Sequence, residues 1–201
     1  MLLTFILSLF CFYISLSVHE ASHAFVAYKL GDPTAKIEGR MTLNPLAHID
    51  LIGTVLVPIF LIFTGIPAFG WAKPVMVDPR NFNSPVRDNF LTAISGPLSN
   101  LIFAVLVAVT LKAIPNTSLF YELGVILVSI NVLLAVFNLI PVPPLDGSKV
   151  WHFILSDEAY FTLERMGPYI LLAVLFVLFM SGNIFFNFVS TIANFLVNKI
   201  V

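Results

Sequence analysis

Long apolar stretches with few charges dominate this chain, and they predict helices that cross a membrane. Residues 1–18 contain no Asp, Glu, Lys or Arg, and the first charge in the chain is Glu20. A helix of residues 1–30 would be about 45 Å long, which exceeds the ~30 Å hydrocarbon core of a bilayer. The sequence Gly31-Asp32-Pro33 is typical of a helix end. Apolar runs at 89–114 and 119–140 predict two further spans.

The apolar stretch 51–69 is less regular, because glycines and prolines interrupt it. It predicts a bent span or a re-entrant segment. Residues 70–77 cannot form a regular helix, and we expect them to return through the protein as a strand with a free edge. Backbone of this kind is tolerated at membrane depth only where protein or a water-filled cavity shields it. The rough alternation of residues 34–43 indicates a short hairpin.

The C-terminal third predicts a polar segment followed by two apolar ones. Residues 148–165 carry most of the late charges and fit an amphipathic helix at the membrane interface. An apolar run begins at Gly167-Pro168 and continues to Met180, and residues 184–201 are apolar again. This end is either a helical hairpin or one span with an interfacial tail.

Composition supports a membrane protein and excludes one class of partner. Hydrophobic residues make up 59% of the chain and charged residues only 10%, whereas a soluble domain carries about 25% charged residues. The net charge is −1 without a basic block, so we expect no nucleic-acid binding. We predict an all-α polytopic membrane protein with five or six membrane segments and a re-entrant or extended stretch. Residues 1–201 would form a single domain, with a core at about 1–155 and C-terminal helical segments at 156–201.

The motif His19-Glu20-Ala21-Ser22-His23 lies inside the first apolar run. Positions i and i+4 of a helix share one face, so His19 and His23 can reach one metal ion. Glu20 lies about 100° round the helix from His19 and can reach water on that metal. In zinc peptidases this pattern supplies two ligands and a general base.

A lone H-E-x-x-H sequence also arises by chance, but the apolar surroundings favour a function here. Each ionisable side chain near the centre of a bilayer costs at least ~2.5–3.5 kcal/mol on insertion scales. Two histidines and a glutamate within five residues therefore favour a metal site. His23 precedes Lys29 by six residues, or about 9 Å along the helix, which places the site inside the membrane near its Lys29 end.

Asp146 is the carboxylate best placed to complete this site. It follows a proline-rich turn at the end of an apolar run. A catalytic zinc takes three protein ligands and leaves one position open, and two His plus a carboxylate is a common set. The alternative carboxylates, which lie in more polar loops, are Asp50, Asp78 and Asp157.

Several other polar residues remain open in role. His48 is a third ligand, a residue that supports the ligands, or an ordinary loop histidine. Asn100 binds substrate or bonds to another helix. Lys29, Lys36 and Arg40 put three positive charges at the end of the first helix and in the loop after it, so the positive-inside rule places this loop in the cytoplasm and the N-terminus outside.

Three motifs in order resemble the site-2 protease family of zinc intramembrane metalloproteases. They are H-E-x-x-H in a first span, G-P-x-x-N from Gly96 to Asn100, and N-x-x-P-x-P-x-L-D-G from Asn138 to Gly147. The resemblance covers about residues 10–155. Within the family, the chain is similar to the short prokaryotic members, which lack a PDZ-like or nucleotide-binding module. It implies one zinc ion held by His19, His23 and Asp146, with Glu20 as catalytic acid/base. It also implies Asn138 and Asn100 as candidates to hold the substrate or the oxyanion.

The expected activity is therefore cleavage of transmembrane segments of membrane proteins, in regulated intramembrane proteolysis. The expected location is a prokaryotic cell membrane, with the active site toward the cytoplasm. The partners are the lipid bilayer and a transmembrane protein substrate, with a regulatory membrane partner or a homo-oligomer as further candidates. The competing hypothesis is a non-enzymatic intramembrane metal-binding or transport protein, because buried His and Asp also mark ion pathways. The position of Glu20 beside the histidines favours the enzyme.

Overall fold

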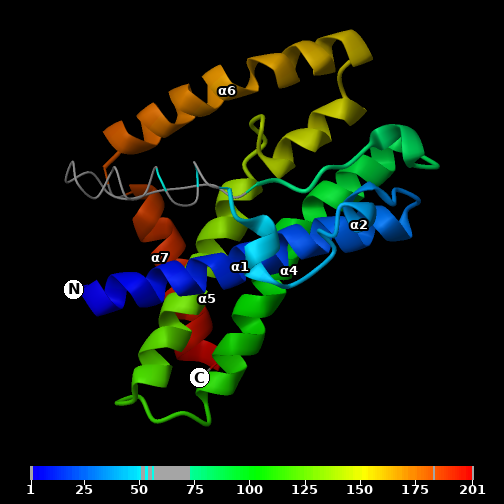
Figure 1. Ribbon diagram of the computed structural model, residues 1–201. Helices are drawn as coiled ribbons and strands as arrows, with labels where there is room; N and C mark the ends of the chain where they lie inside the picture. Colours follow the sequence, from blue (N-terminus) through cyan, green and yellow to red (C-terminus); the bar gives the residue numbers. More distant parts are fainter. Residues whose placement is uncertain (1, 51–52, 54–55, 57–72, 183, 201) are drawn as a thin grey trace.

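The computed structural model describes residues 2–50, 53, 56, 73–182 and 184–200, and its regular elements there are helices (Figure 1). The predicted bent segment at 51–69 falls almost entirely outside these residues. The long helices are α1 (Leu2–Lys29), α4 (Pro85–Leu111), α5 (Leu119–Asn138), α6 (Asp157–Met180) and α7 (Ile184–Ile200). Short helical turns connect them: α2 (Thr34–Ile37), η1 (Pro45–His48), η3 (Pro79–Asn81) and η4 (Asp146–Phe153).

Helix α1 has nearly the predicted bounds, and glycine ends it. Gly31 has φ = 112°, a conformation that side chains with a Cβ rarely adopt, and Pro33 cannot continue the helix. The Asp32 N–H donates to the carbonyl of Ala27 and closes the last turn. The predicted hairpin at 34–43 is wrong, because the Asp32 carboxylate accepts hydrogen bonds from the backbone and hydroxyl of Thr34 and starts helix α2 there.

Helices α1, α4 and α5 pack against one another and form the centre of the molecule (Figure 1). Helix α7 completes the packing against α5 and α4. Small and β-branched side chains line the contacts among α4, α5 and α7 and let these helices approach closely. The buried cluster consists of Ala104 and Ala108 from α4, Val128 and Val132 from α5, and Val189, Ala193 and Val197 from α7.

The prediction for residues 148–168 is wrong in its helix boundaries. The polar stretch forms the 3₁₀ helix η4, and α6 begins at Asp157 and continues through Gly167-Pro168. A proline within a helix removes one backbone hydrogen bond but need not end the helix in a membrane protein. Gly167 lies against the proline-rich turn, since a Cβ there would come within 3.1 Å of the Pro143 Cβ. Close approach to this turn explains why α6 has a glycine at position 167.

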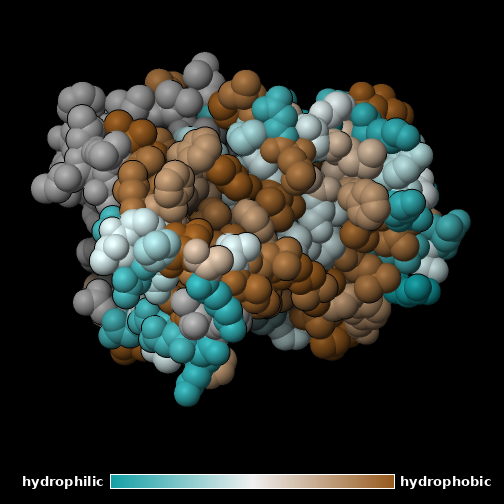
Figure 2. All heavy atoms as spheres, turned by 90° about the horizontal axis from the view of Figure 1, so that it is seen from below, coloured by the Kyte–Doolittle hydropathy of each residue, from teal (hydrophilic) through white to brown (hydrophobic). Residues whose placement is uncertain are grey.

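Three helices among the described residues are long and apolar enough to cross a bilayer: α4, α5 and residues 157–178 of α6. The predicted total of five or six segments stays a prediction. In Figure 2, hydrophobic side chains form a broad band, and polar side chains gather on opposite sides of it. Helix α6 lies apart from the central helices (Figure 1), and exposed apolar side chains such as Tyr169, Leu172 and Phe176 cover it. Such surfaces are stable against lipid rather than water.

Asp32 anchors the chain that passes beside the C-terminal end of α1. Its side chain is fully buried and accepts hydrogen bonds from Thr34, from the Asn81 amide and from the Asp78 N–H, the last at 2.8 Å. Burial raises the pKa of this carboxyl, but the hydrogen bonds outweigh that effect and hold the pKa below its usual value. The charged form of Asp32 therefore stabilises the position of residues 78–81.

We expect Asp32→Asn to lower the melting temperature of the detergent-solubilised protein by roughly 5 °C at pH 7. The amide nitrogen of the new Asn would face a group that now donates a hydrogen bond to the Asp32 carboxylate, so two donors would meet. A carboxyl whose folded pKa is depressed stabilises the protein above its unfolded pKa of about 3.9, and this stabilisation is lost as pH falls further. The difference from wild type should therefore narrow as the pH falls below about 4 in differential scanning fluorimetry. Glu158→Gln is the control, because Glu158 is exposed in the first turn of α6. A difference that stays constant with pH would contradict the role of the Asp32 charge.

Candidate metal centre

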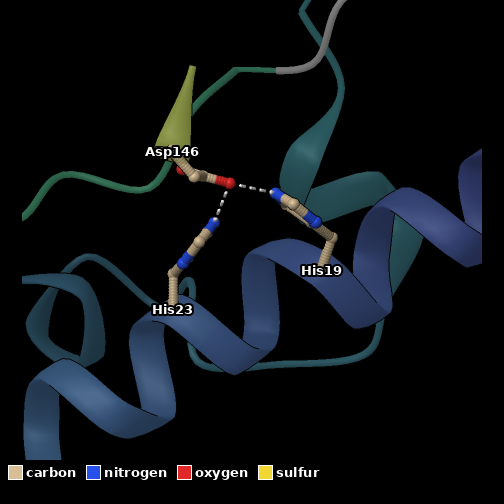
Figure 3. Close-up of side chains that lie close together, drawn as sticks. All are labelled: His19, His23 and Asp146. Atoms are coloured by element: carbon tan, nitrogen blue, oxygen red, sulfur yellow. Dashed lines mark ion pairs between the residues drawn. The ribbon is translucent and has the colours of Figure 1, made fainter. Parts of the chain in front are cut away.

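Two histidines from one helix and an aspartate from a distant turn meet in the interior (Figure 3). His19 and His23 lie one turn apart on α1, with their ring centroids 4.6 Å apart. The Asp146 Oδ2 atom lies 3.1 Å from the His19 Nε2 and 3.4 Å from the His23 Nε2. The three potential ligand atoms all lie within 4.8 Å of one another. The predicted pairing of the histidines with Asp146 is therefore present in the geometry.

The turn between α5 and η4 delivers Asp146 to the histidines. The prolines end α5, and the Leu145 N–H donates to the Val142 carbonyl in a tight turn. The residue after Asp146 must be glycine, since a Cβ on Gly147 would lie 2.4 Å from the Leu139 carbonyl oxygen. The Trp151 indole donates to the Pro141 carbonyl at 2.7 Å and ties η4 back to the turn. These contacts fix the direction of the carboxylate.

The donor set fits a zinc ion. Zinc prefers imidazole nitrogen and carboxylate oxygen in groups of three when a further position stays open. The Asp146 Oδ2 is buried and has no hydrogen-bond donor among the described residues, which is costly for a carboxylate oxygen unless a cation contacts it. The Nδ1 atoms of His19 and His23 face the Asn100 Oδ1 at 2.7 Å and the Thr92 carbonyl oxygen at 2.8 Å. Because both partners are acceptors, each Nδ1 carries the proton and each Nε2 lone pair is free to bind metal.

Helix α4 lies against the two histidines, and every fourth residue of α4 contacts them: Thr92, Gly96 and Asn100. Thr92 and Asn100 hold the two imidazole rings, and Gly96 lies midway between them. A Cβ on Gly96 would come within 2.4 Å of the His23 Nε2 and 2.7 Å of the His19 Cε1. The sequence indicated only that Gly96 permits close helix packing. The structure shows that the imidazoles themselves occupy the space.

Glu20 is buried and contacts a segment without regular structure. Its Oε2 accepts a hydrogen bond from the Val75 N–H at 2.8 Å. Two contacts hold Lys73, whose N–H donates to the His48 carbonyl and whose own carbonyl accepts from Arg40. As predicted, residues 73–77 form no regular helix, and they lie beside Glu20. The predicted strand is not formed by residues 73–78, and residues 70–72 lie outside the described part of the chain.

The remaining candidates lie elsewhere or have other partners. The Asn100 side chain is fully buried and contacts His19, so the structure places it behind a histidine. Asn138 donates to the Leu134 carbonyl of its own helix. His48 is outside the cluster and donates from Nε2 to the Thr42 carbonyl. Among the alternative carboxylates, Asp50 accepts from the Gly53 N–H, Asp78 pairs with Arg80, and Asp157 pairs with His152.

Sequence reasoning missed several residues around the centre. Thr92 acts through its backbone carbonyl and Val75 through its N–H, and no side-chain pattern reveals such contacts. Ser15 and Asn131 are fully buried polar residues within apolar helices. Polar residues inside predicted spans were the available signal for these two.

The fold and the centre define a helical membrane protein with the metal site of a zinc metallopeptidase. The model of Peptidase family M50 matches residues 7–124 and 113–182, and the chain belongs to this family, the site-2 proteases. It is 38% identical over 178 residues to "Putative zinc metalloprotease YwhC" of Bacillus subtilis, covering 82% of this chain and 77% of that protein. It is 31% identical over 149 residues to "Putative zinc metalloprotease MJ0611" of Methanocaldococcus jannaschii, covering 74% of this chain and 71% of that protein.

A third relative is longer than this chain. "Putative zinc metalloprotease Rip2" of Mycolicibacterium smegmatis is 30% identical over 156 residues, covering 77% of this chain and 59% of that protein. No solved structure matches the chain. The family and its relatives make this protein an integral membrane zinc metallopeptidase.

Proposed function

We propose that this protein is an intramembrane endopeptidase that cleaves transmembrane segments of membrane proteins, in regulated intramembrane proteolysis. The observation that carries the proposal is the convergence of His19, His23 and Asp146 beside Glu20, in a chain whose helices α4, α5 and α6 are apolar enough to cross a bilayer. We assign the first three residues as the zinc ligands. Glu20 is the catalytic acid/base.

The chemistry follows from the positions of these groups. A bound zinc ion supplies Lewis acidity, which favours ionisation of water and polarises a carbonyl. Glu20 accepts a proton from the water that attacks the scissile carbonyl and then donates it to the leaving amine. The Val75 N–H holds one oxygen of this carboxylate, and the proposal assigns proton transfer to the other oxygen. Asn138 remains the candidate side chain for the oxyanion.

A transmembrane substrate must unwind locally, because a helix hides its carbonyl groups in its own hydrogen bonds. The segment 73–78 offers a place for the unwound chain. Within the described residues, the backbone N–H groups of Met76 and Val77 have no hydrogen-bond partner. An extended substrate can pair with such an edge by strand addition. We therefore propose that the substrate lies along this segment, beside Glu20.

The proposed orientation follows from the charges around the same segment. Lys29 ends α1 and Lys36 and Arg40 follow it, whereas Lys73 and Arg80 belong to the later segment that packs near it. The positive-inside rule places these residues in the cytoplasm and the N-terminus outside, in a prokaryotic cell membrane. The site would thus receive water from the cytoplasmic side. Selectivity would come from the membrane core, from a regulatory membrane partner or from a homo-oligomer.

The test maps cleavage positions in a panel of single-span proteins. Each would carry helix-breaking residues either inside its span or in the flanking soluble segment, and would be incubated in nanodiscs with zinc-loaded wild type. We expect cleavage inside the span, loss of cleavage after chelation, and recovery when zinc is returned, as read by mass spectrometry. Cleavage confined to the soluble flanks would contradict an intramembrane substrate. Zinc flux into liposomes without cleavage of any panel member would favour the transport alternative.

A further inference from the structure

Three fully buried polar side chains meet where α1, α4 and α5 cross. They are Ser15 of α1, Asn100 of α4 and Asn131 of α5. Burial of such groups is costly unless each donor and acceptor is paired, so a network here requires a compensating role or complete pairing. One end of this network contacts His19 through Asn100. Its other members, Ser15 and Asn131, are not part of the metal-site cluster.

Every polar atom of the two asparagine side chains has a partner. The Asn100 Nδ2 donates to the Ser15 carbonyl at 3.0 Å and to the Asn131 Oδ1 at 2.7 Å. The Asn131 Nδ2 donates to the Ser15 hydroxyl and to the Leu127 carbonyl, both at 2.8 Å. The Ser15 hydroxyl in turn donates to the Cys11 carbonyl at 2.8 Å.

The backbone carbonyls in this network fix the direction of both amides. A carbonyl can only accept, so the atom of Asn100 that faces the Ser15 carbonyl must be its nitrogen. The Leu127 carbonyl fixes the Asn131 nitrogen in the same way. The Asn131 oxygen then faces the Asn100 nitrogen, and the Asn100 oxygen faces the His19 Nδ1. Rotating either amide by 180° would place oxygen against oxygen.

We propose that Asn131 and Ser15 are positioning residues that set the tautomer of His19 through Asn100. With its proton held on Nδ1, His19 presents the Nε2 lone pair toward Asp146 and the zinc ion. Asn131 holds the Asn100 amide in the one orientation that permits this. The network thus couples the packing of three helices to the electronic state of one ligand. This inference rests on the proposed ligand role of His19 but not on the nature of the substrate.

The experiment compares three variants in detergent. Asn131→Leu removes the bonds to Asn100 and to the Ser15 hydroxyl, and Ser15→Ala removes that hydroxyl while leaving the Ser15 carbonyl in place. Ser129→Ala is the matched control, because the Ser129 hydroxyl donates only to the Val125 carbonyl of its own helix. Each protein would be loaded with zinc or cobalt. The readouts are the rate of zinc transfer to a chelator, the visible spectrum of the cobalt form and the melting temperature of the metal-free form.

We expect Asn131→Leu to release zinc about 10-fold faster and to shift the cobalt bands, since groups that support metal ligands change affinity by 10–100-fold. Ser15→Ala should show a smaller change in the same direction, and Ser129→Ala should match wild type. If Asn131→Leu does not fold, Ser15→Ala decides the question alone. Wild-type release rates and spectra in the folded variants, with only a lower melting temperature, would overturn the proposal. Wild-type protein that binds no zinc would instead contradict the ligand assignment on which it rests.

Discussion

Glu20→Gln is expected to keep one zinc ion per chain and to cleave its substrate about 10²–10⁴-fold more slowly than wild type. This range is typical of the loss of a general acid/base. Zinc should remain because the ligand cluster consists of His19, His23 and Asp146 and does not include Glu20. The two side chains have the same shape, and the Gln oxygen can still accept from the Val75 N–H. The variant therefore removes the proton-accepting carboxylate with little change in structure.

The measurement pairs metal analysis with single-turnover cleavage at saturating enzyme, so that substrate binding does not limit the rate. Glu122→Gln is the matched control, because Glu122 lies in the first turn of α5 outside the cluster. It should cleave at the wild-type rate. A Glu20→Gln protein that is zinc-loaded and fully active would contradict the acid/base assignment. Loss of zinc together with activity would show that Glu20 supports the metal site itself.

The sequence predicted the central helices because their signals are local. Long apolar runs predicted α1, α4 and α5 to within a few residues. The boundary of α6 was not predictable in this way, since Gly167-Pro168 reads as a break. Packing of Gly167 against the proline-rich turn lets the helix continue through these residues. Contacts between residues distant in sequence determine this boundary. The hydrophobic pattern of neighbouring residues does not predict such contacts.

The same distinction applies to the candidate site. His19 and His23 were predictable as a pair because helical geometry alone places them on one face. The meeting with Asp146 depends on how α1 packs against the turn after α5, so the residues alone favoured Asp146 without locating it. The role of Asn131 depends on which side-chain atom faces which carbonyl. These contacts form only when α1, α4 and α5 are packed together, so the sequence alone does not predict them.

Gly96→Ala should abolish tight zinc binding although it adds a single methyl group. The new Cβ would lie 2.4 Å from the His23 Nε2 and 2.7 Å from the His19 Cε1, well inside van der Waals contact. The imidazoles cannot turn away easily, because each is held through Nδ1 by Thr92 or Asn100 of the same helix. Movement of α4 as a whole would break both of these bonds. It would also break the bond from the Ser22 hydroxyl to the Ser95 carbonyl.

We expect at least a 100-fold loss of zinc affinity in Gly96→Ala, the upper end of the range for supporting residues, measured by competition with a chelator. Gly124→Ala is the matched control: its Cβ would meet the Leu111 Cδ2 at 2.4 Å, but that atom ends a flexible side chain distant from the ligand cluster. The control should lose some stability and keep its zinc. Overpacking of this kind typically costs about 1–3 kcal/mol, and the higher helix propensity of Ala offsets about 1 kcal/mol of it, so metal-free Gly96→Ala should still fold, with a lower melting temperature. A folded Gly96→Ala protein with wild-type zinc affinity would mean that α4 can retreat from the histidines, and that Thr92 and Asn100 do not hold them as the geometry indicates.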